Sequence, residues 1–190
     1  MRNTEIERKY FMPTKISPDL PSFDTVAHDR YFTSALSLVR LRDDLIKGIE
    51  FTAKTYRSEN NLHRTEVNLS IPNNSIEDCL QFAEIAGMQL RLEFKQKLIV
   101  WLSDDVVISE TLITDLYDKP YTFDLQSKFI STHYIFPIAR FVEIEVLNPK
   151  DPVSAVEIID TWEDKLHLSS KDIIPYSLIQ LFGAFPMEIK

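Results

Sequence analysis

Charged side chains recur at alternate positions along six segments of the sequence. They are Glu5, Glu7 and Lys9; Arg40 and Arg42; Lys54, which alternates with the polar Thr52; Arg64 and Glu66; Lys95 and Lys97; and Glu143 and Glu145. Successive side chains of a strand point to opposite faces of its sheet, so each alternating set points to one side. Lysine and arginine bind phosphate oxygens, whereas carboxylates bind Mg²⁺ or Mn²⁺. Together they indicate the binding of a compact polyanion with a divalent cation.

A solvated strand face explains any single pair of this kind, because charged residues usually lie at the surface. Six segments with the same alternation favour a sheet whose charged faces meet. We therefore expect the strands to close into a barrel, with charged faces inward and apolar faces outward under helices. Enclosed charges are costly unless they pair or bind a ligand of matching charge, which is the role predicted for this cavity.

Helices are expected at three places around these strands. Residues 75–86 begin with a sequence typical of a capping box, Ser75 to Asp78, and end before Gly87. Residues 152–166 begin with a proline, which is favourable at the first helical position, and have apolar residues on one face. A short third helix is expected at 176–182. These helices would cover the apolar outer faces of the strands.

Composition excludes several functions. The chain has 190 residues and a formal net charge of −8, from 21 Lys and Arg against 29 Asp and Glu. The nearest two of its three glycines, Gly48 and Gly87, are 39 residues apart, which excludes a glycine-rich phosphate loop. The acidic charge argues against a nucleic-acid partner. Without a repeat, a linker or a long apolar run, we expect one cytoplasmic α+β domain over residues 1–190 and no membrane partner.

Eight sequence blocks, in order along the chain, resemble the CYTH superfamily, the triphosphate tunnel metalloenzymes. The family includes class IV adenylyl cyclases, thiamine triphosphatases and inorganic triphosphatases. The blocks are Glu5-x-Glu7-x-Lys9, Asp29-Arg30-Tyr31-Phe32, Arg40-x-Arg42, Thr52-x-Lys54, Arg64-x-Glu66, Lys95-x-Lys97, Glu143-x-Glu145 and Pro175-Tyr176-Ser177-Leu178. Two positions depart from the family pattern: Asn68 replaces a charged residue and Lys97 replaces an arginine.

The resemblance implies a closed antiparallel eight-stranded β-barrel, open at its ends as a tunnel, with flanking helices. It implies catalytic roles for Glu5, Glu7, Lys9, Glu143 and Glu145. Phosphate ligands would be Lys9, Arg40, Arg42, Lys54, Arg64, Lys95 and Lys97, and metal ligands Glu5, Glu7, Glu66, Asp124, Glu143 and Glu145. For the acidic residue expected between positions 102 and 140, Glu110 and Asp115 are alternatives to Asp124.

The predicted function is hydrolysis of inorganic tripolyphosphate, thiamine triphosphate or a nucleoside triphosphate with Mg²⁺ or Mn²⁺. One alternative is a cyclase that converts ATP to cyclic AMP and pyrophosphate. Another is a module that binds a polyphosphate or nucleotide without turnover. A small-molecule triphosphate is the expected partner, and a homodimer is expected because relatives often pair.

Overall fold

The structure of the chain is a computed structural model. It describes residues 3–12, 14–33, 38–55, 64–125, 134–136, 138–174 and 178–182. Within these ranges, only the backbone is described for residues 3–5, 54–55, 64–66, 123–125, 134–136 and 179–180.

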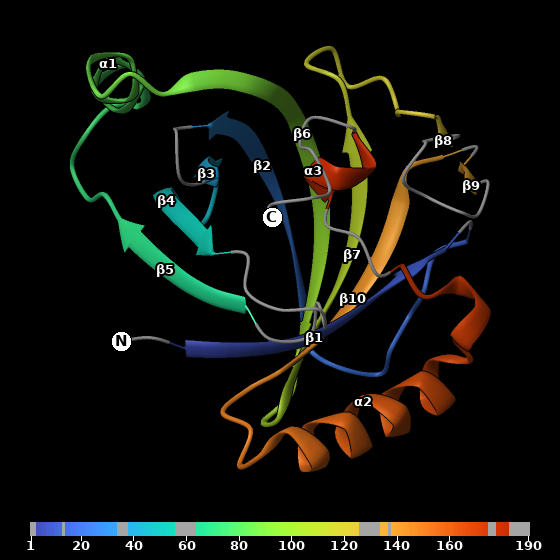
Figure 1. The fold of residues 1–190 in the computed structure, drawn as a ribbon. Helices are drawn as coiled ribbons and strands as arrows, with labels where there is room; N and C mark the ends of the chain where they lie inside the picture. Colours follow the sequence, from blue (N-terminus) through green and yellow to red (C-terminus); the bar gives the residue numbers. More distant parts are fainter. Residues whose placement is uncertain are drawn as a thin grey trace, which may run out of the picture.

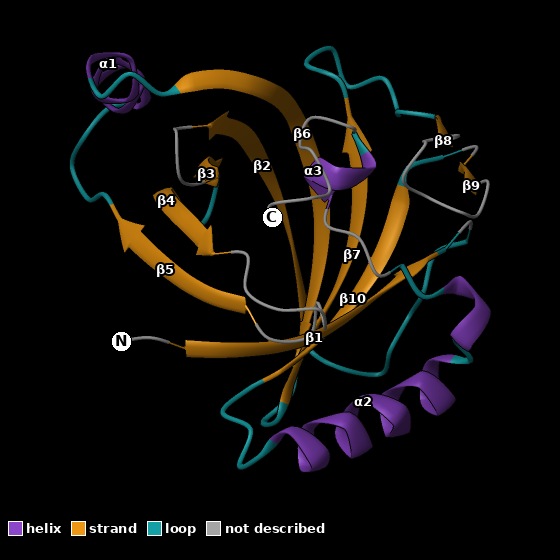
Figure 2. Cartoon of the chain, in the orientation of Figure 1, coloured by secondary structure: helices purple, strands orange, loops and turns teal. Residues whose placement is uncertain are grey.

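Eight antiparallel strands form one strongly curved sheet (Figure 1 and Figure 2). Their order across the sheet is β1-β10-β7-β6-β2-β3-β4-β5. In chain order they are β1 (Asn3–Phe11), β2 (Ser22–Thr33), β3 (Leu38–Asp44), β4 (Gly48–Thr55), β5 (Arg64–Ser70), β6 (Gln89–Leu102), β7 (Val106–Thr114) and β10 (Arg140–Val146). Two short strands, β8 (Phe123–Leu125) and β9 (Tyr134–Phe136), pair with each other in a separate sheet.

The two ends of this strand order meet over a short ladder. β1 pairs with β10 over six residue pairs, but with β5 over only three, from Asn3↔Glu66 to Glu5↔Arg64. The predicted α+β architecture with eight antiparallel strands is confirmed. Closure of the barrel along the full length of the strands is not confirmed, because the β1–β5 ladder is half as long as the β1–β10 ladder.

The two longer helices lie where their capping residues predict. α1 (Ile76–Ile85) begins with a complete capping box between Ser75 and Asp78, and Gly87 follows it with a φ of 69°. α2 (Pro152–Leu166) begins after Asp151, whose carboxylate accepts hydrogen bonds from two backbone N–H groups of the first turn. α3 (Leu178–Leu181) is shorter in the described residues than the third helix predicted at 176–182.

Helices cover parts of both faces of the sheet. On the outer face, α2 buries apolar residues of β1, β7 and β10, including Ile6, Ile108 and Ile144, and α1 packs on Phe32 and Leu41. α3 lies on the inner side, where Leu181 packs among inward-facing aromatic residues (Figure 1). Among the described helices, none has both the length and the apolar character needed to cross a bilayer.

Candidate active site

The curved sheet encloses a cavity of about 610 Å³. All eight large strands contribute to its lining, together with the turn between β3 and β4 through Lys47 and α3 through Leu178. This volume lies within the usual range of roughly 300–1,000 Å³ for small-molecule sites. Most of its polar lining residues occupy alternate positions along their strands, as the sequence predicts.

One end of the cavity is apolar. Tyr31, Leu38, Phe141 and Leu178 line it there and belong to a larger cluster with Phe94 and Leu181. Asp44 and Glu145 also line the cavity and lie toward the opposite ends of β3 and β10, the strands that carry Leu38 and Phe141. Among the described lining residues, we call the apolar end beside α3 the floor of the cavity, and the opposite end, with Asp44 and Glu145, its mouth.

Carboxylates occupy the wall formed by β1 and β10. Glu7, Glu143 and Glu145 line the cavity, and Glu7 lies directly opposite Glu145 in the ladder. Lys9 lies opposite Glu143, and its Nζ is 2.6 Å from Glu143 Oε2. The structure thus brings together four of the residues that the sequence predicts to be catalytic.

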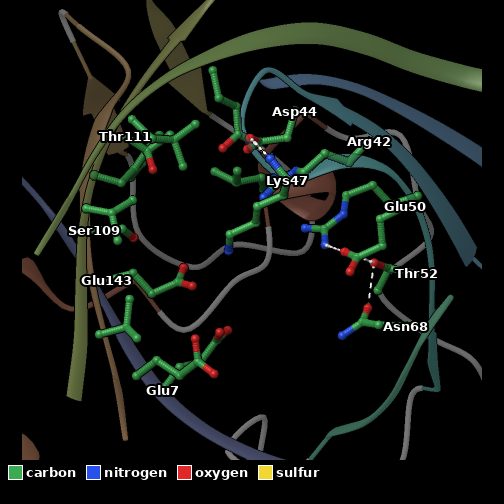
Figure 3. Close-up of a pocket in the computed structure, with 18 of the residues that line it drawn as sticks. Glu7, Arg42, Asp44, Lys47, Glu50, Thr52, Asn68, Ser109, Thr111 and Glu143 are labelled. Carbon is green, nitrogen blue, oxygen red and sulfur yellow. Dashed lines mark hydrogen bonds and ion pairs between the residues drawn. The ribbon is translucent and has the colours of Figure 1, made fainter. Parts of the chain in front are cut away.

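Arginine and hydroxyl groups occupy the facing wall. Arg40 Nη2 donates a hydrogen bond to Thr52 Oγ1 at 2.9 Å and is 3.6 Å from Glu50 Oε1. Thr52 Oγ1 in turn lies 2.7 Å from Asn68 Oδ1, so the residue that replaces an expected charge belongs to this network. Figure 3 shows Glu7 and Glu143 across the cavity from Glu50, Thr52 and Asn68.

Arg42 is fixed by a buried carboxylate on the inner face of β2. Asp29 is fully buried, and its two oxygens accept hydrogen bonds from Arg42 Nε and Nη2, each at 2.7 Å. Gln96 Nε2 donates a third, at 2.6 Å. Burial alone would raise the pKa of Asp29, but the charge and hydrogen bonds of Arg42 outweigh burial and hold this pKa below its usual value.

Asp29 was not among the predicted site residues, although it begins the second family-like block. The available signal was a charged residue on the strand that precedes the Arg40-x-Arg42 strand. In the β2–β3 ladder, Asp29 is the cross-strand partner of Arg42.

Lys47 is a further cation of the cavity that the sequence reasoning missed. It lies in the turn between β3 and β4 and lines the mouth. Figure 3 shows its side chain pointing into the cavity between the two charged walls. The available signal was Asp44 followed four residues later by Gly48, a pattern typical of a tight hairpin that positions the residues between them.

The third wall is mostly neutral. β6 presents Gln96, Leu98 and Val100 to the cavity, and β7 presents Val107, Ser109 and Thr111. Lys95 and Lys97 therefore point to the opposite face of β6, where their Nζ atoms lie 3.6 and 3.4 Å from carboxylate oxygens of Asp118. The prediction that these two lysines bind phosphate in the cavity is wrong. The register of β6 places Gln96 and Leu98 on the inner face and Lys95 and Lys97 on the outer face.

Some predicted site residues lie outside the described side chains. They are Glu5, Lys54, Arg64, Glu66 and Asp124. Their backbones are described, and the ladders pair Glu5 with Arg64 and Lys54 with Glu66. Asp124 belongs to β8 and so to the separate two-stranded sheet.

The two alternatives to Asp124 do not line the cavity. Glu110 is buried and accepts a hydrogen bond from the backbone N–H of Ile16 at 2.9 Å, and Asp115 accepts backbone hydrogen bonds within its own turn.

The charges that line the cavity nearly cancel. Four described cations, Lys9, Arg40, Arg42 and Lys47, face five carboxylates, Glu7, Asp44, Glu50, Glu143 and Glu145, for a formal sum of −1. In the part of the chain that the structure describes, no three carboxylate, histidine or cysteine groups form a ready-made metal site. A polyanion that enters this cavity therefore needs cations beyond those of the described lining.

No family model and no curated protein sequence matches the chain. Solved structures do match it along nearly its whole length. A conserved hypothetical protein from Pyrococcus furiosus has a TM-score of 0.68 at 21% identity, over 93% of this chain and 99% of its own. A candidate adenylate cyclase from Vibrio parahaemolyticus has a TM-score of 0.63 at 13% identity, over 96% and 99%.

A third similar structure is an adenylyl cyclase candidate from Hippeastrum with a dominant triphosphatase activity. Its TM-score is 0.55 at 12% identity, over 97% of this chain and 96% of its own. The chain shares the fold of these solved structures. In this fold, the acidic residues of β1 and β10 and the arginines of β3 lie in one cavity, as the sequence blocks imply.

Proposed function

We propose that this protein is a metal-dependent triphosphatase that binds its substrate inside the curved sheet, with the seam between β1 and β5 closing the tunnel around it. The observation that carries the proposal is the pair of facing walls: carboxylates of β1 and β10 on one side and arginines of β3 on the other. Phosphoryl transfer requires mainly positioning and neutralisation of charge, and these two walls supply both.

The arginine wall accounts for substrate binding. Arg40 and Arg42 alternate along β3, so their guanidinium groups follow the direction in which an extended triphosphate would lie. Guanidinium groups bind phosphate oxygens through paired hydrogen bonds. Asp29 occupies one edge of Arg42, which leaves the remaining nitrogen, Nη1, for the ligand.

The acidic wall accounts for the metal requirement. Mg²⁺ commonly binds one or two protein carboxylates and completes its coordination with water and substrate phosphate oxygens. Glu7 and Glu145, directly opposite each other in the ladder, fit that role with Glu143 beside them. When bound, Mg²⁺ or Mn²⁺ supplies the positive charge that the near-neutral lining lacks.

The chemical step is attack of water on the terminal phosphorus. A bond forms between the water oxygen and this phosphorus, the bond to the bridging oxygen breaks, and diphosphate or a nucleoside diphosphate leaves with the bridging electrons. A glutamate of the acidic wall accepts the proton of the water. Lys9, 2.6 Å from Glu143, orients that carboxylate and adds positive charge near the reacting phosphate.

An adenylate cyclase is the second candidate, favoured by the neutral wall. Leu98, Val100 and Val107 offer an apolar surface within the same cavity, against which a nucleoside could pack. The candidate cyclase from Vibrio parahaemolyticus shares the fold, but a shared fold does not determine the reaction. A module that binds a polyphosphate or nucleotide without turnover is the third candidate function.

Incubation with tripolyphosphate, thiamine triphosphate and ATP separates these functions. With Mg²⁺ or Mn²⁺, we expect release of phosphate from at least one of the three, and ADP with phosphate when ATP is the substrate. Cyclic AMP with pyrophosphate from ATP would establish the cyclase instead. Binding of all three without any product would establish the binding module.

A further inference from the structure

The hairpin between β3 and β4 holds its turn in a fixed conformation. Asp44 Oδ1 accepts hydrogen bonds from the backbone N–H groups of Ile46 and Lys47, at 2.8 and 2.9 Å, and from Thr25 Oγ1 at 2.9 Å. Gly48 completes the turn with a φ of 79°, in the left-handed region that glycine adopts readily. Asp44 itself is 4% exposed, so the anchor of this turn is buried.

Lys47 projects from this fixed turn into the mouth of the cavity (Figure 3). Three other cations of the described lining have carboxylate partners: Lys9 has Glu143, Arg40 has Glu50 and Arg42 has Asp29. The ammonium group of Lys47 has no such partner among the described residues. An entering anion therefore meets, at Lys47, a cation that needs no existing ion pair to be broken.

The position of Lys47 distinguishes long anions from short ones. Along β3, Leu38 lies at the apolar floor, Arg40 and Arg42 follow, and Lys47 lies beyond the end of the strand. In the proposed binding mode, two phosphate groups held between Arg40 and the Lys9–Glu143 pair would not extend past Arg42 to the mouth. A third phosphate group, or the terminal phosphates of a longer chain, extends toward Lys47.

We propose that Lys47 is a specificity-determining residue: it binds the phosphate group nearest the mouth and so favours triphosphates and longer linear polyphosphates over diphosphate. This inference rests on the proposed function, because it assigns the outer end of the same site. It also gives the β3–β4 hairpin a role that neither the family-like blocks nor the strand alternation assigns to it.

Calorimetric titration tests the proposal with two probes in the presence of Mg²⁺: pyrophosphate and a methylene-bridged triphosphate analogue, which resists hydrolysis. For Lys47→Met we expect the triphosphate analogue to bind about five- to twentyfold more weakly, the range for one solvent-accessible charged hydrogen bond. The affinity for pyrophosphate should change less than about twofold. Lys47→Arg, which keeps the charge, should retain most of the affinity for the analogue.

Lys119→Met is the matched control, because Lys119 is an exposed lysine on a turn outside the cavity. It should leave both affinities unchanged, and thermal unfolding should show that both methionine variants are folded. Equal affinity of Lys47→Met and the unchanged protein for the analogue would overturn the proposal, as would equal losses for both probes. Failure of the unchanged protein to bind either probe would instead contradict the proposed function itself.

Discussion

Asp29 and Arg42 form a bidentate ion pair across the β2–β3 ladder, with both hydrogen bonds at 2.7 Å. Asp29 is fully buried, whereas Arg42 reaches the cavity. The carboxylate therefore positions the guanidinium without itself meeting the ligand. Loss of either partner leaves a charge without its counterion in a poorly hydrated place.

Asp29→Asn should weaken both stability and ligand binding. The amide has the same shape but removes the negative charge, so we expect the free energy of unfolding to fall by about 2–4 kcal/mol. Because Arg42 loses its fixed orientation, we also expect a higher KM for the triphosphate. Urea unfolding and steady-state kinetics measure the two effects.

Glu93→Gln is the control for this variant, because Glu93 pairs with Arg30 at 2.7 Å on the outer face of the same sheet. This substitution should leave KM unchanged. A KM for Asp29→Asn equal to that of Glu93→Gln would show that Asp29 does not position Arg42 for binding.

Acid should destabilise the protein in part through Asp29. The pKa of Asp29 is lowered in the folded state, because the effect of Arg42 exceeds that of burial. As pH falls, the Asp29 carboxylate is therefore protonated at a higher pH in the unfolded chain than in the folded one. The stabilisation is fully present above the ordinary aspartate pKa of about 3.9 and is lost as pH falls through the folded value. Urea midpoints between about pH 5 and pH 2.5 should therefore fall more steeply for the unchanged protein than for Asp29→Asn. Parallel curves would contradict this linkage.

Lys95 and Lys97 should be dispensable for turnover. Both pair with Asp118 on the outer face of β6, whereas Lys9 lies in the cavity beside Glu143. The double variant Lys95→Met/Lys97→Met should keep its kcat/KM within about twofold, and Lys9→Met should lose about tenfold or more. Comparable losses in both variants would mean that the β6 lysines reach the substrate.

The affinity for the metal ion should depend on the carboxylates of β1 and β10. Glu145→Gln removes one of two carboxylates that face each other across the β1–β10 ladder. We expect the Mg²⁺ concentration for half-maximal turnover to rise about tenfold or more. Glu157→Gln, at an exposed position on α2, should leave it unchanged. Turnover that persists in excess EDTA would argue against a metal requirement.

Strand alternation predicted much of the cavity correctly. Glu7, Lys9, Arg40, Arg42, Glu143 and Glu145 all line it, because residues two apart on a strand share a face. The same rule does not say which face points inward. For Lys95 and Lys97 that choice depends on the register of β6 against β2 and β7, which pairs residues far apart in sequence.

Two further features could not be predicted from local patterns. Asp29 meets Arg42 only through a cross-strand pairing, and Lys47 enters the cavity only because Asp44 and Gly48 fix the hairpin. The starts of α1 and α2 were easier to predict from the sequence, because the capping residues Ser75 and Asp151 bind backbone groups only a few residues away.

The initial rate of phosphate release from tripolyphosphate with Mg²⁺, compared between the unchanged protein and Arg40→Gln, tests the central claim most directly. Arg40 lines the cavity and is positioned by Thr52 and Glu50. The proposed function predicts release by the unchanged protein and a loss on the order of 100-fold in the variant, the effect typical of removing one group that stabilises transition-state charge. No release by the unchanged protein, or equal release by both, would contradict it.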